Sequence, residues 1–337
     1  MNKEIQAKIK SALASNIATS GASQAREELQ ERYEIEAEYA DSEYGLWACI
    51  KLLSDLIEEM RSAGVVISPG YGHLTCSFLL HLAGVTNVNP VEWDLPFWRF
   101  LHPFILGNEL KLETGTGGIA VAEKVLLSNR NIISFAQGTF QFIYREGNVE
   151  KTFLLNIIEY PEIDCFKSTL QDGWHRLDET TLRLFRSGQT EGSIWFESGK
   201  MREWLIDFCP ESMSDLVLLR TLYYPRRIEL FPEILRRKKN PNKIPSTGEE
   251  DADDILRDTY GLLVYQEQAM LLTDIGFLHP NAIGKISKWN EQIYQKALSP
   301  VVIPYNQLAV KGHEIARTML SIEALWSRNN KKQGRDR

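Results

Sequence analysis

The spacing of apolar residues predicts helices in the N-terminal part of the chain. Over residues 26–61 they recur at intervals of three and four, as at Leu46, Ile50 and Leu53, with acidic residues between them. This period is typical of an amphipathic helix. Residues 1–25 alternate polar and small residues and end in a serine–glycine stretch, which favours a frayed helix followed by a linker.

Residues 65–68 form a short β-branched run that predicts a strand. The glycine turn 69–72 follows, and then an apolar helix that ends near Leu82. When a strand, a glycine turn and a helix follow one another, backbone N–H groups can face an anion. The pattern therefore indicates a possible anion-binding turn.

Farther along the chain, apolar and polar residues alternate with a period of two, which predicts strands. We expect these strands over residues 109–113, 132–135 and 152–160, with glycines marking a turn between them. After residue 172 the pattern becomes mostly helical, with one further strand expected over residues 192–196. The hydrophobic pattern thus indicates a mixed α/β region followed by a mainly helical one.

The composition is ordinary for a globular protein with a sizeable core: 43% of the 337 residues are hydrophobic and 25% are charged. No apolar run reaches the roughly 18 to 20 residues that span a bilayer. The N-terminus has no apolar secretory core, and the four cysteines are far apart and form no Cys-x-x-Cys pair. We expect a cytoplasmic protein with no membrane association, no disulfide scaffold and no zinc site.

The formal net charge of −7 speaks mildly against tight autonomous binding to nucleic acid, because such binding depends largely on neutralising phosphates. A local basic cluster nevertheless lies beside two tyrosines, and aromatic rings next to arginines suit single-stranded or primer–template DNA. A solvated helix end is an equally good interpretation, because basic side chains favour the C-terminal end of a helix dipole. The candidate DNA-binding residues are Arg226, Arg227, Arg236 and Arg237.

Several segments resemble, in the same order, blocks of one protein family. Residues 67–101, which include PGYGH and VTNVNP, look like the palm signature of the C-family replicative polymerases. Residues 188–225 and 259–270 look like blocks of the fingers of these polymerases, and Lys311-Gly312-His313 resembles a weaker block. The 259–270 motif, TYGLLVYQEQAM, matches almost residue for residue, and the sequence reveals no packing reason for that match. The chain is therefore similar to the bacterial DNA polymerase III alpha subunit, in a shortened and divergent form.

The resemblance implies an α/β fold: a polymerase-palm, nucleotidyltransferase-like mixed sheet with helices, followed by a mainly α-helical fingers-like region. The expected domains are an N-terminal helix and linker over residues 1–25, a palm-like domain over 26–165, a fingers-like helical domain over 166–327, and a disordered basic tail over 328–337. The family's exonuclease-like domain, thumb, clamp-binding segment and oligonucleotide-binding domain are expected to be missing.

Polymerases of this family resemble nucleotidyltransferases that hold two divalent ions with carboxylates on adjacent strands. Their P-D-x-D-x-D motif is matched here by Glu109, Lys111 and Glu113, so a lysine stands at the middle position. Its amine would place a positive charge in the ion site and form a salt bridge with Glu109 or Glu113. The third acid is expected to be replaced by Asn156, with Asp164 as an alternative. Glu109 and Glu113 are weak metal candidates, and magnesium is the cofactor implied if the protein is active.

The triphosphate turn of the family is also changed, because its arginine is absent. Gly70, Gly72 and Ser77 remain and could bind an anion, although we favour a purely structural turn. Near the place of the family's paired arginines in the fingers, the chain offers lysines, which supply a point charge without the bidentate fork of arginine. The candidate nucleotide-binding residues are Gly70, Gly72, Ser77, Lys285 and Lys288.

These changes predict a polymerase III alpha-like protein that is catalytically impaired and binds DNA or the replication machinery. One alternative is an active minimal DNA-directed DNA polymerase, or nucleotidyltransferase, that uses Glu109 and Glu113 with magnesium. A second alternative is a protein-interaction module with no role in binding nucleic acid. Primer extension and DNA binding distinguish the three hypotheses.

Overall fold

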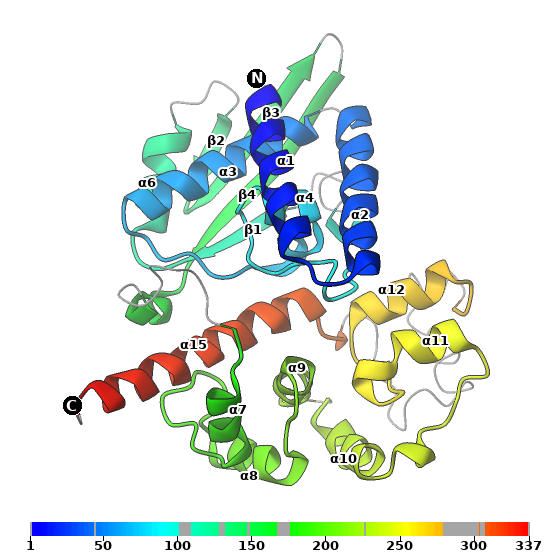
Figure 1. Cartoon of the computed structure of the whole chain (residues 1–337). Coiled ribbons are helices and arrows are strands. Elements are labelled where there is room, and N and C mark those ends of the chain that lie inside the picture. Colours follow the sequence, from blue (N-terminus) through cyan, green and yellow to red (C-terminus); the bar gives the residue numbers. More distant parts are fainter. Residues whose placement is uncertain are drawn as a thin grey trace. The chain divides into compact units, whose positions relative to one another are not determined.

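The computed structural model divides into two units, Met1–Trp174 and His175–Arg337 (Figure 1). The division lies close to the boundary expected between residues 165 and 166. No helix among the described residues is long and apolar enough to cross a membrane. The residues that the structure describes are 2–43, 45–100, 109–127, 132–146, 149–166, 176–225, 227–278, 303 and 307–335.

The N-terminal unit combines helices with a mixed sheet of four strands. Its strands are β1 (Glu109–Thr114), β2 (Ile132–Ala136), β3 (Thr139–Glu146) and β4 (Val149–Glu159). Its helices are α1 (Asn2–Thr19), α2 (Ser23–Ser42), α3 (Leu46–Ser62), α4 (Phe78–Leu82) and α6 (Gly118–Leu126), with short 3-10 helices η1 (Gly72–Cys76) and η2 (Pro161–Phe166).

The sheet has the strand order β1-β4-β3-β2, with β1 parallel to β4 and the other neighbours antiparallel. Alternating residues face the core, and Leu110, Leu112 and Leu155 are each at most 3% exposed. Phe142 and Phe153, on neighbouring strands, stack with ring centroids 4.9 Å apart. Burial of this apolar face is the main source of stability for the sheet.

The strands expected over residues 109–113, 132–135 and 152–160 are confirmed as β1, β2 and β4. The sequence pattern did not predict β3, which forms a tight hairpin with β2. The two residues between them, Gln137 and Gly138, have positive φ angles of 46° and 81°. Such angles are typical of the two-residue turns that join hairpin strands.

The strand expected over residues 65–68 is not a strand of the sheet. Ile67 instead makes an isolated bridge with Thr114, and Ser68 N donates a hydrogen bond to the Glu113 carbonyl at 3.0 Å. Because only one bridge forms, the segment attaches to the end of β1 without extending the sheet.

Within residues 1–25 the expected helix is confirmed as α1, and a short break at residues 20–22 follows it, but the helix is packed in the N-terminal unit rather than frayed. Ile5, Ile9 and Leu13 lie about one turn apart and are at most 6% exposed. Residues four apart share one face of a helix, so a sparse apolar stripe is enough to bury this face. The pattern was too weak for the sequence alone to show it.

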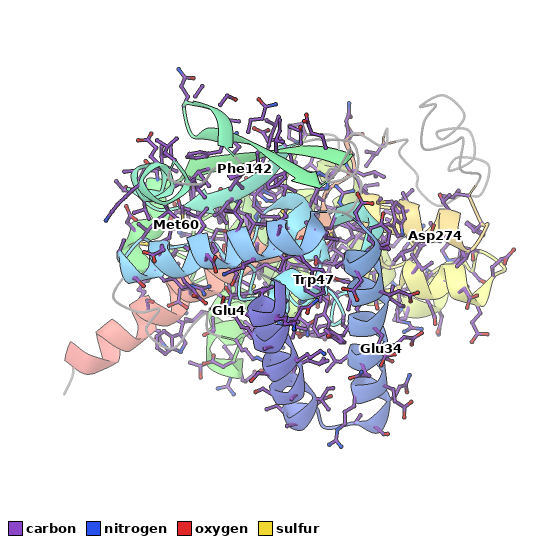
Figure 2. The ribbon with its side chains drawn as sticks, turned by 90° about the horizontal axis from the view of Figure 1, so that it is seen from above. Glu4, Glu34, Trp47, Met60, Phe142 and Asp274 are labelled. Atoms are coloured by element: carbon purple, nitrogen blue, oxygen red, sulfur yellow. The ribbon has the colours of Figure 1, made fainter. Side chains whose placement is uncertain are left out.

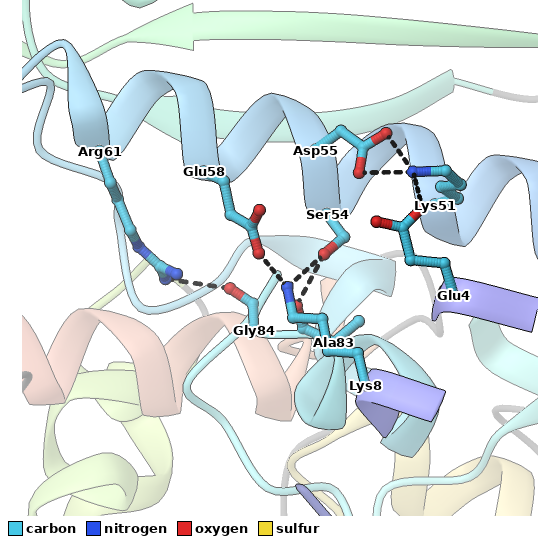
Figure 3. A network of polar contacts seen from close by, with 9 residues as sticks. All are labelled: Glu4, Lys8, Lys51, Ser54, Asp55, Glu58, Arg61, Ala83 and Gly84. Atoms are coloured by element: carbon cyan, nitrogen blue, oxygen red, sulfur yellow. Dashed lines mark hydrogen bonds and ion pairs between the residues drawn. The ribbon is translucent and has the colours of Figure 1, made fainter. Parts of the chain in front are cut away.

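Polar contacts also connect α1 to α3 (Figure 3). Lys8 donates to Ser54 Oγ at 2.7 Å and forms an ion pair with Glu58. Lys51 of α3 lies 3.5 Å from the carboxylate of Glu4. Exposed ion pairs contribute only about 0–1 kcal/mol each, so the apolar contacts provide most of the attachment.

The helical pattern expected over residues 26–61 is confirmed and is divided between two helices, α2 and α3. Gly45 precedes α3 with a φ of 83°, a left-handed conformation that glycine adopts at little cost. Leu53 and Ile57, on the inner face of α3, are almost completely buried. Figure 2 shows the sheet, α3, and the pair α1 and α2 as successive layers of this unit.

The described part of the C-terminal unit is mainly helical, as the resemblance implied. Its helices are α7 (Glu179–Arg186), α8 (Gly199–Phe208), α9 (Met213–Leu222), α10 (Phe231–Lys239), α11 (Glu250–Ile255), α12 (Gln266–Asp274) and α15 (Lys311–Arg335), with 3-10 helices η4 (Ile228–Leu230), η5 (Pro241–Lys243) and η6 (Arg257–Thr259).

Helix α9 forms the core of this unit. Each of its residues from Asp215 to Leu222 is buried, and α15 packs against it. Trp204 of α8 stacks on Phe231 of α10 with ring centroids 3.8 Å apart. A helix that is buried on all sides is typical of the centre of a helical domain.

Two expectations for this unit are wrong. Residues 192–196 form turns rather than a strand, with positive φ angles at Gly192 (76°) and Trp195 (67°). Helix α15 continues to Arg335, so a helix covers most of the segment 328–337 that was expected to be a disordered tail. Lys, Gln and Arg are strong helix formers, so a basic composition does not by itself indicate disorder.

Candidate functional site

The positions that match the family's acid motif lie on β1, beside β4. Successive side chains of a strand point to opposite faces, so Glu109, Lys111 and Glu113 share one face and the leucines between them face the core. The parallel register pairs Lys111 with Asn156. The structure therefore brings together the motif positions and the position expected for the third acid.

Lys111 and Glu109 form an ion pair, with Lys111 Nζ 3.2 Å from Glu109 Oε2. The two side chains are 41% and 30% exposed, so water screens the pair. An ammonium group donates hydrogen bonds and has no lone pair for a cation, and Asn156 adds only a neutral amide. These residues do not fit a pair of divalent cations, which need several anionic oxygen ligands.

The remaining acids lie in different surroundings. Glu113 is only 2% exposed, whereas Asp164 lies at the turn that follows β1. Thr116 N donates to the two Asp164 oxygens at 3.1 and 3.2 Å, so this carboxylate closes the turn. Within the part of the chain that the structure describes, no group of three or more His, Cys, Asp or Glu side chains could hold a metal ion.

The glycine turn is shaped by packing. A Cβ atom added at Gly70 would lie 2.6 Å from both Thr75 Cγ2 and Thr86 Oγ1, so a larger residue does not fit there. Gly72 has a φ of 50°, which favours glycine. The Thr86 hydroxyl donates to the Pro69 carbonyl at 2.8 Å and ties the turn to the chain beyond α4. These contacts explain both glycines without a ligand.

A buried carboxylate occupies the start of α4. Glu36 of α2 accepts hydrogen bonds from the Ser77 hydroxyl (2.9 Å), Phe78 N (2.9 Å) and Leu79 N (3.0 Å). Arg32, one helical turn earlier, donates to the same carboxylate at 2.6 Å. An internal anion therefore takes the place that the resemblance implied for a phosphate, and Ser77 serves this contact.

Glu36 was not among the expected site residues. Its signal in the sequence is its position on one helix face with Leu29 and Ala40, which are also buried. A charged residue on an apolar face must find a partner, and Arg32 is four residues away. The pattern could have indicated a buried ion pair, but not its contact with α4.

The two predicted DNA-binding residues on α10, Arg236 and Arg237, differ in burial and in hydrogen-bond partners. Arg237 is 4% exposed and donates to Glu233 Oε1 at 2.7 Å and to the Tyr260 carbonyl at 2.9 Å. The side chain of Arg236 is 46% exposed and binds the same carboxylate. Hydrogen bonds from Arg236, and then from Arg237, lower the pKa of Glu233 to about 2. Arg237 is therefore a structural residue, and Arg236 faces solvent.

Arg227 is also largely buried, with 9% of its surface exposed. Its guanidinium lies over the Tyr224 ring, 4.9 Å from the centroid, and donates to the Gln307 carbonyl at 3.3 Å. The other predicted binding residues, Arg226, Lys285 and Lys288, lie outside the residues that the structure describes.

Arg227 also belongs to a group whose other charged members, Arg220 and Arg317, the sequence analysis did not identify. We call it the arginine–aromatic cluster; its members are Trp195, Arg220, Tyr224, Arg227 and Arg317. Arg220 forms an ion pair with Glu314 of α15, and the two side chains are 2% and 6% exposed. These residues come from α9, α15 and two connecting segments, so their proximity is a product of the tertiary fold.

The 259–270 motif has a packing role after all. Gln268 accepts hydrogen bonds from Val264 N and Tyr265 N, each at 3.0 Å. It donates to Thr259 Oγ1 at 2.8 Å and to the Ile255 carbonyl at 3.1 Å. Gln268 and Thr259 are nearly or fully buried. The polar residues of this motif therefore fix the chain between η6 and α12.

Two parts of this chain match family models of known protein domains. The bacterial DNA polymerase III alpha NTPase domain matches residues 1–104, and the bacterial DNA polymerase III alpha subunit finger domain matches residues 170–277. The first match begins at α1, in agreement with the packing of that helix in the N-terminal unit. The second covers the described helices from α7 to α12.

Similar proteins carry the name DNA polymerase III subunit alpha. That of Halalkalibacterium halodurans is 28% identical over 175 residues, which are 47% of this chain and 15% of the relative. That of Borreliella burgdorferi is 32% identical over 121 residues, or 36% and 10% of the two chains. That of Xylella fastidiosa is 40% identical over 94 residues, or 27% and 8%.

The matched segments thus span at most 15% of the length of these three relatives. The two domain matches fall on both units of the structure, and both domains belong to the same subunit. The chain therefore belongs to the family of bacterial DNA polymerase III alpha subunits.

Proposed function

We propose that this chain is a polymerase III alpha-like protein that no longer transfers nucleotides and that binds DNA or the replication machinery. The observation that carries the proposal is the ion pair of Lys111 with Glu109, opposite Asn156, at the positions of the family's acids. The relatives are named as subunits of a DNA polymerase, which supports DNA as the partner.

Electrostatics is the reason for the loss of catalysis. Two-metal transfer needs carboxylates that hold the cations while one cation activates the attacking oxygen and the other stabilises the leaving oxygen. Lys111 adds a positive charge at this place, and repulsion opposes cation binding. The engagement of Ser77 by Glu36 supports the same conclusion, because it uses donors that a triphosphate would need.

Primer extension tests the catalytic part of the proposal. The full chain is incubated with a labelled primer–template, all four deoxynucleotides, and magnesium or manganese. We expect no incorporation. Incorporation that the substitution Glu113→Gln abolishes would demonstrate an active site and overturn the proposal.

Calorimetric titration with magnesium and with manganese tests the physical cause. The double substitution Lys111→Asp and Asn156→Asp restores carboxylates on both strands, and we expect it to bind the cations when the unaltered chain does not. Lys124→Asp reverses an exposed charge on α6 and serves as the matched control. Cation binding by the unaltered chain that Glu109→Gln removes would contradict the mechanism.

Fluorescence anisotropy with a labelled primer–template tests the partner. We expect an affinity that falls steeply as salt is added, because phosphate contacts release counterions. Undetectable binding at low ionic strength, together with nuclease-resistant recovery of protein partners alone, would favour a protein-interaction module instead.

A further inference from the structure

The arginine–aromatic cluster concentrates positive charge around two rings of the C-terminal unit. The guanidinium carbons of Arg220 and Arg317 lie 5.0 and 4.7 Å from the centroid of the Trp195 ring. Those of Arg220 and Arg227 lie 5.6 and 4.9 Å from the centroid of Tyr224. The negative faces of aromatic rings attract such cations, so the rings hold three guanidinium groups close together.

The pKa values of two groups at this place are lowered, first by burial and then by neighbouring positive charges. Burial, with contributions from the charges of Arg317 and Arg227, lowers the pKa of Arg220 to about 10. Burial, and then Arg317 and Arg220, lower the pKa of His313 to about 3, so this histidine is neutral at pH 7. An added anion would relieve the part of each shift that comes from the neighbouring arginine charges.

The cluster also holds hydrogen-bond donors that lack an acceptor. Among the residues that the structure describes, Arg220 Nε and Arg227 Nε are buried and have no hydrogen-bond partner. Arg220 is 2% exposed and Arg227 is 9% exposed. A buried donor without an acceptor is costly, by about 1–3 kcal/mol and more when it is charged, so an oxyanion at this place would be stabilising.

One side of the cluster is open to solvent. Tyr224 is 39% exposed, although its hydroxyl accepts a hydrogen bond from Arg220 at 3.1 Å. Trp195 has a φ of 67°, a left-handed conformation that is rare for a large side chain. Strain of this kind occurs at binding sites, where the surrounding structure holds an unfavourable backbone in place.

We propose that the arginine–aromatic cluster binds single-stranded DNA, with phosphate oxygens accepting hydrogen bonds from Arg227 and Arg317 and a base stacking on the exposed ring of Tyr224. Arg220, held by Glu314, positions the two rings. This inference rests on the proposed function and names its DNA-binding surface. It shares Arg227 with the residues expected from the sequence and does not include Arg237, which is bonded to Glu233 and Tyr260.

Stacking and phosphate contacts together favour a strand over a free phosphate. A phosphate alone would use the arginines and leave Tyr224 without a role, whereas an unpaired base can cover that ring. Duplex DNA presents its bases already stacked, so it offers Tyr224 no exposed base face. The cluster therefore fits an unpaired strand best.

The test measures anisotropy of a labelled oligothymidylate with the full chain at low and moderate salt. Arg317→Gln removes a phosphate donor, and Tyr224→Ala removes the stacking ring; we expect each to weaken binding about tenfold. Tyr224→Phe keeps the ring and should keep most of the affinity. Arg183→Gln, on α7 with a 74% exposed side chain, removes the same charge and should change the affinity less than about twofold.

Thermal unfolding of each variant shows whether it is folded. Wild-type affinity in both Arg317→Gln and Tyr224→Ala, with salt-sensitive binding in all chains, overturns this inference and leaves the proposed function in place. Absence of oligothymidylate binding by the unaltered chain at low salt overturns this inference, and absence of primer–template binding as well would remove DNA as the partner in the proposed function. Inorganic triphosphate and an unlabelled oligonucleotide are compared as competitors. If triphosphate displaces the labelled strand at the lower concentration, the cluster binds free phosphate and the proposal of a DNA site is overturned.

Discussion

The β1–β4 face of the N-terminal unit and the 259–270 motif of the C-terminal unit both resemble blocks of the polymerase III alpha family, but they retain different properties. On the sheet, the register that places Lys111 beside Asn156 remains, whereas the negative charges that metal binding needs do not. In the motif, Gln268 and Thr259 remain and are bonded inside the protein. The two regions differ in their partners: the family's acids on the sheet bind a ligand, whereas Gln268 and Thr259 form hydrogen bonds within the protein.

A polar side chain whose hydrogen-bond partner lies inside the protein is difficult to replace, because its loss destabilises the fold. A buried donor or acceptor that loses its partner costs about 1–3 kcal/mol. Glu36 and Ser77 are of this kind, although they lie in the unit whose acid positions have changed. Side chains whose partner is a ligand contribute little to stability, so they can change while the fold persists. This comparison predicts large effects at Glu36 and Gln268 and a small effect at Lys111.

The substitution Glu36→Ala is expected to have the largest effect. It leaves Arg32, Ser77 and two backbone N–H groups of α4 without their acceptor, and loss of one partner of a buried ion pair costs about 3–5 kcal/mol. Urea unfolding measures the change. Glu34→Ala, at an exposed position of the same helix (Figure 2), should change stability by less than about 0.5 kcal/mol. Equal effects of the two substitutions would refute the structural role of Glu36.

The substitution Gln268→Leu tests the motif of the C-terminal unit. It keeps the approximate volume but leaves Val264 N and Tyr265 N without an acceptor, so we expect a loss of about 2–4 kcal/mol. Urea unfolding followed by circular dichroism measures it. The control is Gln189→Leu at an exposed position. A loss below that of the control would mean that the motif has another reason to persist.

The fold could be predicted where one local pattern decides the structure. A period of two placed β1, β2 and β4, because the sheet buries one face of each strand. The division of α2 from α3 depends on one left-handed residue, Gly45, and a glycine inside a helical pattern does not reveal its φ angle. The burial of α1 depends on tertiary contacts that its sparse apolar stripe does not specify.

The candidate site was predictable to the extent that it depends on register. Alternation placed Glu109, Lys111 and Glu113 on one face, which predicted an ion pair of Lys111 with an adjacent glutamate. The expectation of Asn156 beside them came from the resemblance to the family, with Asp164 as the alternative. The capping of α4 by Glu36 joins residues 41 to 43 positions apart, and no local pattern encodes such a contact. The pairing of Arg220 with Glu314 was missed for the same reason.

Lowering the pH should destabilise the folded protein, because His313 lies beside the buried arginines of the C-terminal unit. The pKa of His313 is about 3 in the folded protein and about 6.5 when unfolded, so the unfolded chain binds a proton that the folded chain rejects. The contribution of the neutral histidine to the free energy of unfolding is therefore complete above pH 6.5, and it is lost progressively as the pH decreases towards 3. At pH 5 the loss from this residue is about 2 kcal/mol. Urea unfolding at pH 7.5 and pH 5 should show this loss, and His313→Gln should remove it; an unchanged pH dependence in the variant would contradict the assignment.

The smallest effect is expected at Lys111, although this residue carries the proposed loss of catalysis. Its ion pair with Glu109 is solvent-exposed, and such pairs contribute about 0–1 kcal/mol, so Lys111→Gln should change the urea midpoint very little. The substitution removes the positive charge but adds no carboxylate, so primer extension should remain absent. A large loss of stability would show that Lys111 is a structural residue like Gln268, and the contrast between the two regions would then disappear. A gain of extension would show instead that the amine alone had blocked an otherwise complete site.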